Sequence, residues 1–170
     1  MANIIANHNS KILKERSNSE EIKETCNCQK GIKSCPLQGK CLTSSIVYKA
    51  TVNTSDGTTK TYIGCTDSTF KKRYYGHVSD TKNRDNRNNT ELAGYIWDKK
   101  DAGINIDGIK WEILKKCHKY QPGGEKCDVC LSEKLCIMKD SDPRSLNKRS
   151  ELMNTCRHRW KWRLDNIKRK

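Results

Sequence analysis

Five side chains in the middle of the sequence are of the types that hydrolysis of a phosphodiester bond needs. The reaction requires a group that deprotonates water, positive charge beside the phosphoryl oxygens and help for the leaving oxygen. Glu133 offers a hard oxygen ligand for one Mg²⁺ or Mn²⁺ ion. Arg73 offers a planar fork that matches a phosphate. Tyr48, Tyr62 and His77 are the candidates for moving the proton.

The sequence leaves two candidates for the general base. The unperturbed pKa of a tyrosine is about 10, so Tyr62 needs nearby cations that lower its pKa before it can act at neutral pH. The unperturbed pKa of a histidine is about 6.5, so His77 needs no such help. Taken singly, each side chain also fits a structural role in a strand or on a basic helix. Only their combination indicates catalysis.

Cysteines near the start of the chain predict a first zinc site. Cys26, Cys28, Cys35 and Cys41 stand close together, with glycine and proline between them. Four thiolates with such spacers suit a knuckle around one tetrahedral zinc ion, and we predict this knuckle over residues 26–44. The alternative is that some of the four are free thiols.

A second structural zinc site is predicted nearer the end of the chain. Cys127-x2-Cys130 is a common half-site, and Cys156-x-His158 supplies the other half. Four protein ligands leave no open position on the ion, which makes it structural. The rival ligands lie in the same region: Cys117 with His118, and Cys136. In the alternative without metal, Cys130 and Cys156 are small buried apolar residues.

Two alternating apolar runs predict a β-hairpin over residues 45–65 that carries both tyrosines. Asp56-Gly57 between the runs is a typical hairpin turn. A helix is predicted next, over 67–84, with Asp67 or Ser68 as its N-cap. Arg73 and His77 are four residues apart and therefore share one face of this helix, which we expect to meet the tyrosines.

Further elements complete an α+β pattern. Thr90 is a suitable cap for a second helix that ends near Gly103, and residues 109–114 predict a third strand. A helix over about 128–138 follows, and we expect it to turn one apolar stripe to the core: Leu131, Leu135 and Met138. A last helix is predicted from about Ser145, and residues 144–170 carry ten Lys/Arg against two acidic residues, a net charge of +8.

The order of these motifs resembles the GIY-YIG nuclease family. Tyr62-Ile63-Gly64 matches the second half of the family's name, whereas Ile46-Val47-Tyr48 keeps only the tyrosine of the first half. Arg73-x3-His77 and Glu133 match the family's helix residues and metal-binding glutamate, and Asn147 best matches its late asparagine. The flanking Cys-Pro-Leu-x-Gly-x-Cys and Leu-Asn-Lys-Arg segments resemble the endonuclease domain of Penelope-like retroelements.

The resemblance implies a small three-stranded antiparallel sheet flanked by helices, and a metal-dependent endonuclease that nicks DNA for retroelement insertion. Its catalytic residues would be Tyr48, Tyr62, Arg73, His77, Glu133 and Asn147, with a tyrosine usually assigned as the base. We accordingly divide the chain into an N-terminal extension or linker (1–25), the cysteine knuckle (26–44), the nuclease core (45–143) and a basic C-terminal helix that contributes to the second zinc site (144–170). The extension would join the domain to a longer polyprotein that contains a reverse transcriptase.

The composition agrees with a nucleic-acid partner. A net charge of +14 in 170 residues indicates that the chain meets a polyanion, because phosphate contacts dominate the affinity for DNA. No secretory signal or transmembrane-length apolar run is visible, so we expect an intracellular, reducing compartment, the nucleus, and no membrane partner. The alternative function is a non-catalytic, zinc-containing DNA-binding module.

Overall fold

The computed structural model describes residues 26–28, 34–121, 126–148, 150–153, 155–156 and 158. Its elements follow the order β1 (Ser44–Thr54), β2 (Thr59–Thr69), α2 (Phe70–Lys82), the 3₁₀ helix η2 (Arg84–Asn89), α3 (Glu91–Asp101), β3 (Ile106–Lys116), α4 (Asp128–Lys139) and α5 (Ser150–Met153). The predicted α+β class is confirmed. The N-terminal extension 1–25 and the predicted basic helix beyond His158 lie outside the described residues.

The predicted hairpin is the centre of the sheet. β1 and β2 pair antiparallel, and Tyr48 lies opposite Gly64 while Ala50 lies opposite Tyr62. The turn forms because Gly57 adopts a φ of 77° and the Asp56 carboxylate accepts a hydrogen bond from the Thr58 N–H at 3.0 Å. β3 pairs antiparallel with the other edge of β1, which gives the strand order β2-β1-β3.

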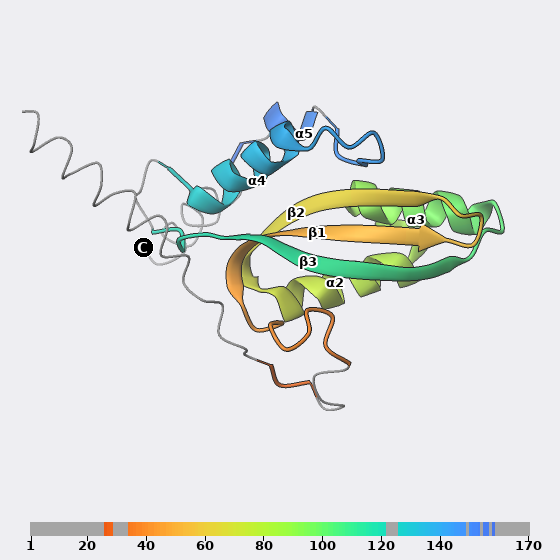
Figure 1. Ribbon diagram of the computed structural model, residues 1–170, viewed down its shortest axis with the longest axis horizontal. Coiled ribbons are helices and arrows are strands. Elements are labelled where there is room, and N and C mark those ends of the chain that lie inside the picture. The colour runs from red at the N-terminus through yellow and green to blue at the C-terminus, as the bar shows by residue number, and fades with distance from the viewer. Residues whose placement is uncertain are drawn as a thin grey trace, which may run out of the picture.

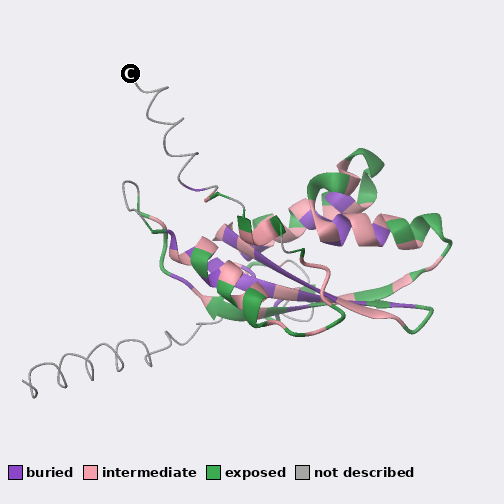
Figure 2. Cartoon of the chain, turned by 90° about the horizontal axis from the view of Figure 1, so that it is seen from above, coloured by how far each residue is buried: buried purple, intermediate pink, exposed green. Residues whose placement is uncertain are grey.

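Helices cover both faces of this sheet. Figure 1 shows α4 and α5 on one side of the strands and α2 on the other. Side chains alternate across β1, so Tyr48 faces the core shared with α2 and α3, whereas Val47 faces the core under α4. Buried residues accordingly follow the strands and the inner sides of the helices (Figure 2). None of the helices in the described part of the chain has the length and apolar character that crossing a membrane requires.

Helix α2 begins at Phe70, three residues later than the sequence predicts. Thr69, not Asp67 or Ser68, is the N-cap, and its side chain accepts a hydrogen bond from the Lys72 N–H. Strand β2 runs through Asp67 and Ser68 to Thr69, so its last residue is also the cap of the helix. The shift leaves Asp67 at the end of a strand, beside the start of the helix.

The predicted core face of α4 is wrong. Leu131, Leu135 and Met138 are 47%, 51% and 69% exposed. Val129 is fully buried instead, and Cys136 packs with it in the core under α4. Both sides of this helix carry apolar residues, so periodicity alone cannot select the inner face.

The segment after α4 is extended where the sequence predicts a helix. Ser145 forms a parallel bridge with Thr61 on the outer edge of β2, and the Thr61 N–H donates to the Arg144 carbonyl at 3.0 Å. α5 begins only at Ser150. The pairing covers part of the sheet edge that β2 would otherwise expose.

Candidate active site and metal centres

A polar cluster forms where α2 crosses the sheet. The Tyr48 hydroxyl lies 2.8 Å from His77 Nε2 and 3.0 Å from Arg73 Nε. Tyr48 is fully buried and His77 is 3% exposed. The rings of Tyr62 and His77 lie edge to face at 6.2 Å between centroids. The expected meeting of both tyrosines with the Arg–His pair of the helix is therefore present.

Gly64 makes this close approach possible. A Cβ at Gly64 would lie 2.7 Å from the Tyr48 hydroxyl and 3.0 Å from a ring carbon of Tyr62. Any side chain at this position would push the tyrosines apart or distort β2. The glycine of the Tyr-Ile-Gly triplet thus has a packing reason in this chain.

Burial fixes the protonation states inside the cluster. Burial, together with the neighbouring Arg73 charge, lowers the pKa of His77 to about 3. Burial raises the pKa of Tyr48 to about 12, even though Arg73 opposes this shift. At neutral pH the histidine is neutral and the tyrosine is protonated. Arg73 can only donate, so the Tyr48 O–H donates to His77 Nε2 while its oxygen accepts from Arg73.

Tyr62 stands in a different position, on the wall of a cleft. Burial and the neighbouring Tyr48 raise its pKa above the ordinary value, and Arg73 acts in the opposite direction. The cleft has a volume of about 310 Å³ and lies between β2, α2, α4 and α5. Its lining includes both catalytic candidates of opposite charge, Arg73 from α2 and Glu133 from α4. His77 is not part of this lining.

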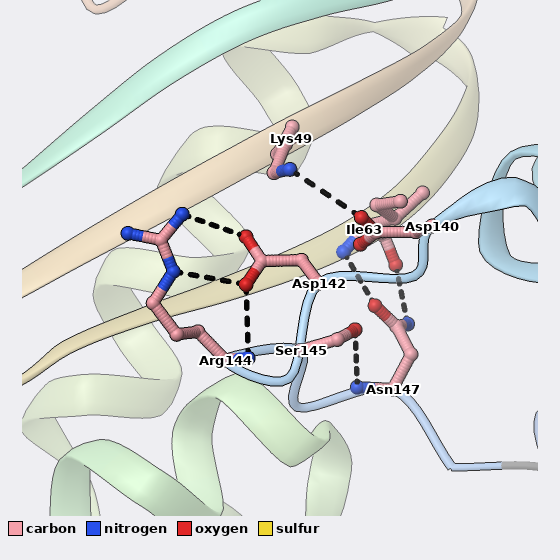
Figure 3. A network of polar contacts seen from close by, with 7 residues as sticks. All are labelled: Lys49, Ile63, Asp140, Asp142, Arg144, Ser145 and Asn147. Carbon is pink, nitrogen blue, oxygen red and sulfur yellow. Dashed lines mark hydrogen bonds and ion pairs between the residues drawn. The ribbon is translucent and has the colours of Figure 1, made fainter.

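The Asn147 side chain binds the backbone of Ile63 on β2 through two hydrogen bonds (Figure 3). Its side-chain carbonyl accepts from the Ile63 N–H at 2.7 Å, and its amide donates to the Ile63 carbonyl at 2.8 Å. The same amide donates to Glu151 at 2.8 Å. The predicted late asparagine therefore orders the sheet edge and the start of α5, and it does not line the cleft.

Sequence reasoning missed several residues of the cleft. Glu151 lines it as a second carboxylate, held by the Asn147 amide and the Lys148 N–H. Asp67 and Cys65 line it from β2. Strand alternation gives no signal for them, because β2 residues of both parities line the cleft, Tyr62 and Thr66 as well as Cys65 and Asp67.

The N-terminal cluster, defined as Cys26, Cys28, Cys35 and Cys41, brings its four sulfurs within 4.8 Å of one another. Cys41 Sγ lies 3.6 Å from Cys26 Sγ and 3.7 Å from Cys28 Sγ. Zn–S bonds of about 2.3 Å in a tetrahedron place the sulfurs about 3.8 Å apart, whereas a disulfide needs about 2.05 Å. These separations fit one four-thiolate metal site.

Backbone geometry supports a thiolate in this cluster. Gln38 and Gly39 adopt φ values of 49° and 94°, in the left-handed region. Burial raises the pKa of Cys35, but hydrogen bonds from the backbone of Gly39 and Leu37, together with those from the Cys41 and Cys26 side chains, outweigh burial and lower that pKa to about 7. The thiolate is the form that binds metals.

The C-terminal cluster, defined as Cys127, Cys130, Cys156 and His158, also brings its ligand atoms within 4.8 Å of one another. Cys130 Sγ lies 3.7 Å from Cys156 Sγ, and His158 Nδ1 lies 3.2 Å from Cys127 Sγ. A hydrogen bond from Cys65, with a further one from His158, lowers the pKa of Cys130 to about 3.

This ligand set is the one predicted from the spacing of the residues. Neither Cys117 nor Cys136, the rivals, belongs to a metal-binding group among the described residues. Two Cys-rich groups in the described chain can therefore hold zinc.

The second ring nitrogen of His158, the histidine of the C-terminal cluster, meets a carboxylate. His158 Nε2 lies 3.4 Å from Asp67 Oδ2 at the end of β2. Histidines that bind metals through one nitrogen commonly donate the other N–H to a carboxylate, which fixes the ring and its tautomer. Cys130 and His158 themselves line the cleft, so the C-terminal cluster forms part of its wall.

The sequence-predicted ligand for a Mg²⁺ or Mn²⁺ ion, Glu133, lies in the lining of the cleft. Glu133 is half-buried on α4, three residues after Cys130, and its charge acts on both Tyr48 and Tyr62. Among the described residues, no group of three or more metal ligands includes Glu133. A single carboxylate suits Mg²⁺, which commonly takes its remaining ligands from water and substrate phosphates.

No family model, curated protein or solved structure matches this chain.

Proposed function

We propose that this chain is a metal-dependent DNA endonuclease with a GIY-YIG-like core, which nicks DNA by phosphodiester hydrolysis. The observation that carries the proposal is the convergence of Tyr62, Arg73 and Glu133 on one cleft, from a strand and two helices far apart in sequence. The strongly basic composition and the order of the motifs support DNA as the substrate. Insertion of a Penelope-like retroelement, action beside a reverse transcriptase domain and a nuclear location follow from the resemblance of the sequence.

Arg73 binds the scissile phosphate in this proposal. Its Nε donates to the Tyr48 hydroxyl, which anchors the guanidinium, and its side chain lines the cleft. A charge-assisted fork held in place before the substrate arrives stabilises the charge that develops on the phosphoryl oxygens. Neutral His77 has a positioning role, since it accepts the Tyr48 hydrogen bond and fixes the phenol that anchors Arg73.

Tyr62 is the proposed proton acceptor. It lines the cleft, whereas His77 is buried behind it and has a pKa of about 3, too low for an efficient base at neutral pH. The pKa of Tyr62 is raised in the protein alone, so cationic charge must arrive with the substrate complex. Glu133 would hold the Mg²⁺ or Mn²⁺ ion, which when bound supplies this charge and polarises the phosphate.

Both cysteine clusters hold structural zinc ions in this proposal. The four-ligand sets leave no open coordination position, and their S–S separations of 3.6 to 3.7 Å fit tetrahedral zinc. Neither ion takes part in the reaction. The C-terminal ion would fix the start of α4, and with it Glu133.

A nicking assay on supercoiled plasmid tests the proposal. The full chain should convert plasmid to the open circle with Mg²⁺ or Mn²⁺ and not with EDTA. Glu133→Ala should abolish nicking while retaining fold and DNA affinity, and Glu112→Ala, an exposed glutamate of β3, is the matched control. Wild-type activity in Glu133→Ala would contradict the assignment of the metal ligand.

The second candidate function is a non-catalytic, zinc-containing DNA-binding module. The two cysteine clusters and the basic charge favour it, as does the loss of the glycine and isoleucine positions before Tyr48. It predicts tight, salt-dependent DNA binding. In the same plasmid assay it predicts no nicking with any metal.

A further inference from the structure

A glycine stands inside the helix that carries the catalytic candidates. Gly76 lies in the middle of α2, between Arg73 and His77. Glycine is disfavoured inside helices because it loses the most backbone freedom on folding. Its presence at this position therefore calls for a local reason.

Neither backbone conformation nor packing supplies that reason. Among the described residues the glycines with positive φ are Gly39, Gly57 and Gly103, and Gly76 is not one of them. A Cβ built at Gly76 meets no atom within 4 Å. Gly64, by contrast, would clash with two tyrosines. A side chain at Gly76 would thus fit the protein itself.

A side chain at Gly76 would occupy part of the cleft. Gly76 lines it together with Lys72 and Arg73, which stand four and three residues earlier on the same face of α2. Two cations and a bare stretch of helix backbone therefore stand side by side. Glu133 and Lys134 of α4 belong to the lining of the same cleft.

We propose that the sugar-phosphate backbone of the bound DNA strand comes closest to α2 at Gly76, and that the missing side chain admits the strand to Arg73. The inference rests on the proposed function and adds to it a contact point that sets how deeply the strand enters the cleft. Lys72 stands one turn before Gly76, where its exposed ammonium can meet a neighbouring phosphate.

The test is a size series at Gly76 in the full-length chain. Gly76→Ala and Gly76→Gln introduce good helix formers of increasing volume, so each should raise the Tm, by about 2 to 4 °C for alanine. Both should weaken binding of a fluorescein-labelled DNA duplex, measured by anisotropy in the Glu133→Ala background. We expect a rise in Kd of about tenfold for alanine, and more for glutamine, as a charge-assisted phosphate contact is lost.

Gly94 provides the matched control. It lies inside α3, away from the cleft, and a Cβ there makes only an ordinary contact of 3.7 Å with the Arg87 carbonyl. Gly94→Ala should raise the Tm by a similar amount and leave the Kd unchanged. A more stable protein that binds more weakly separates a ligand contact from a folding defect.

The outcomes distinguish two failures. If wild-type protein neither binds nor nicks DNA, the proposed function is overturned, and the inference with it. If wild type binds and nicks but both Gly76 variants bind equally well, only the inference is overturned. A Gly76→Ala protein with a lower Tm than wild type would also overturn it, because the glycine would then serve the fold.

Discussion

The two cysteine clusters have similar ligand chemistry and different neighbours. The N-terminal cluster lies in the segment before β1, where Cys35 and Cys41 pack into the core shared with Ile46 and Phe70. None of its cysteines lines the cleft. The C-terminal cluster ties the start of α4 to the chain after α5, and Cys130 and His158 are part of the cleft wall.

The difference separates two uses of one kind of site. Near β1, a zinc ion held by the four thiols would close a short segment that has few apolar residues of its own. A structural metal stabilises such a segment where a hydrophobic core cannot. Near α4, a zinc ion bound by the C-terminal cluster would set the position of Glu133, one turn beyond Cys130. The first site should matter mainly for stability, and the second for both stability and nicking.

Cys127→Ser should have the largest effect. It removes a buried ligand that does not itself line the cleft, so the bound zinc per chain should fall from two ions to one, and stability should fall by several kcal/mol. Nicking by the remaining folded protein should drop about 100-fold, the cost of misplacing a catalytic group by about 1 Å. Metal analysis, urea unfolding and the plasmid assay measure the three quantities.

A matched substitution guards this result. Cys136→Ser changes a half-buried cysteine of the same helix that lies outside the cluster, and it should leave both zinc ions in place. If Cys136→Ser lost an ion while Cys127→Ser kept both, the ligand assignment would fail.

Cys41→Ser tests the other half of the comparison. Cys41 is fully buried, and the Lys71 N–H at the start of α2 donates to its carbonyl at 2.7 Å. The substitution should remove the first zinc ion and cost stability comparable to that of Cys127→Ser. Nicking per folded molecule should fall by no more than about tenfold, because α2 keeps its Thr69 cap and the packing of Phe70. Equal loss of nicking in both variants would mean that both clusters position the cleft.

The sequence predicts the parts of this molecule that depend on local rules. The hairpin follows from alternation and the Asp56-Gly57 turn, and Arg73 and His77 share a face because of their spacing. The C-terminal cluster could be predicted because Cys127-x2-Cys130 is a known half-site for zinc, and Cys156-x-His158 offers the two further ligands.

Features that depend on tertiary packing were not predictable. α4 carries apolar residues on two sides, and only the packing of Val129 against the sheet decides which side faces inward. Asn147 bonds to the backbone of Ile63, which is 84 residues away in sequence, and no local sequence pattern predicts that contact. Leu131, on the opposite side of the helix, is exposed for the same reason, although its apolar side chain predicts burial.

The smallest effect is expected at Asp67, which links the two halves of the cleft. Its carboxylate meets His158 Nε2 at 3.4 Å, while its backbone belongs to the end of β2, two residues before the cap of α2. Asp67→Ala should weaken the second zinc site alone, by about 10- to 100-fold in affinity, because the histidine ring loses the partner that orients it. Competition with a chromophoric chelator should show one weakened ion and one unchanged ion per chain.

The size of that change decides what the carboxylate does. Asp67→Asn keeps an oxygen that can accept the imidazole N–H, so it should restore part of the zinc affinity that alanine loses. Ser68→Ala, at the neighbouring cleft position, should change neither ion. If asparagine and alanine weakened both zinc ions equally, Asp67 would be acting on the fold of the β2–α2 junction and not on the histidine. A selective and partly rescued loss would show instead that the C-terminal zinc ion is coupled through His158 to the strand that leads into α2, so that one metal orients both the Glu133 helix and the Arg73 helix across the cleft.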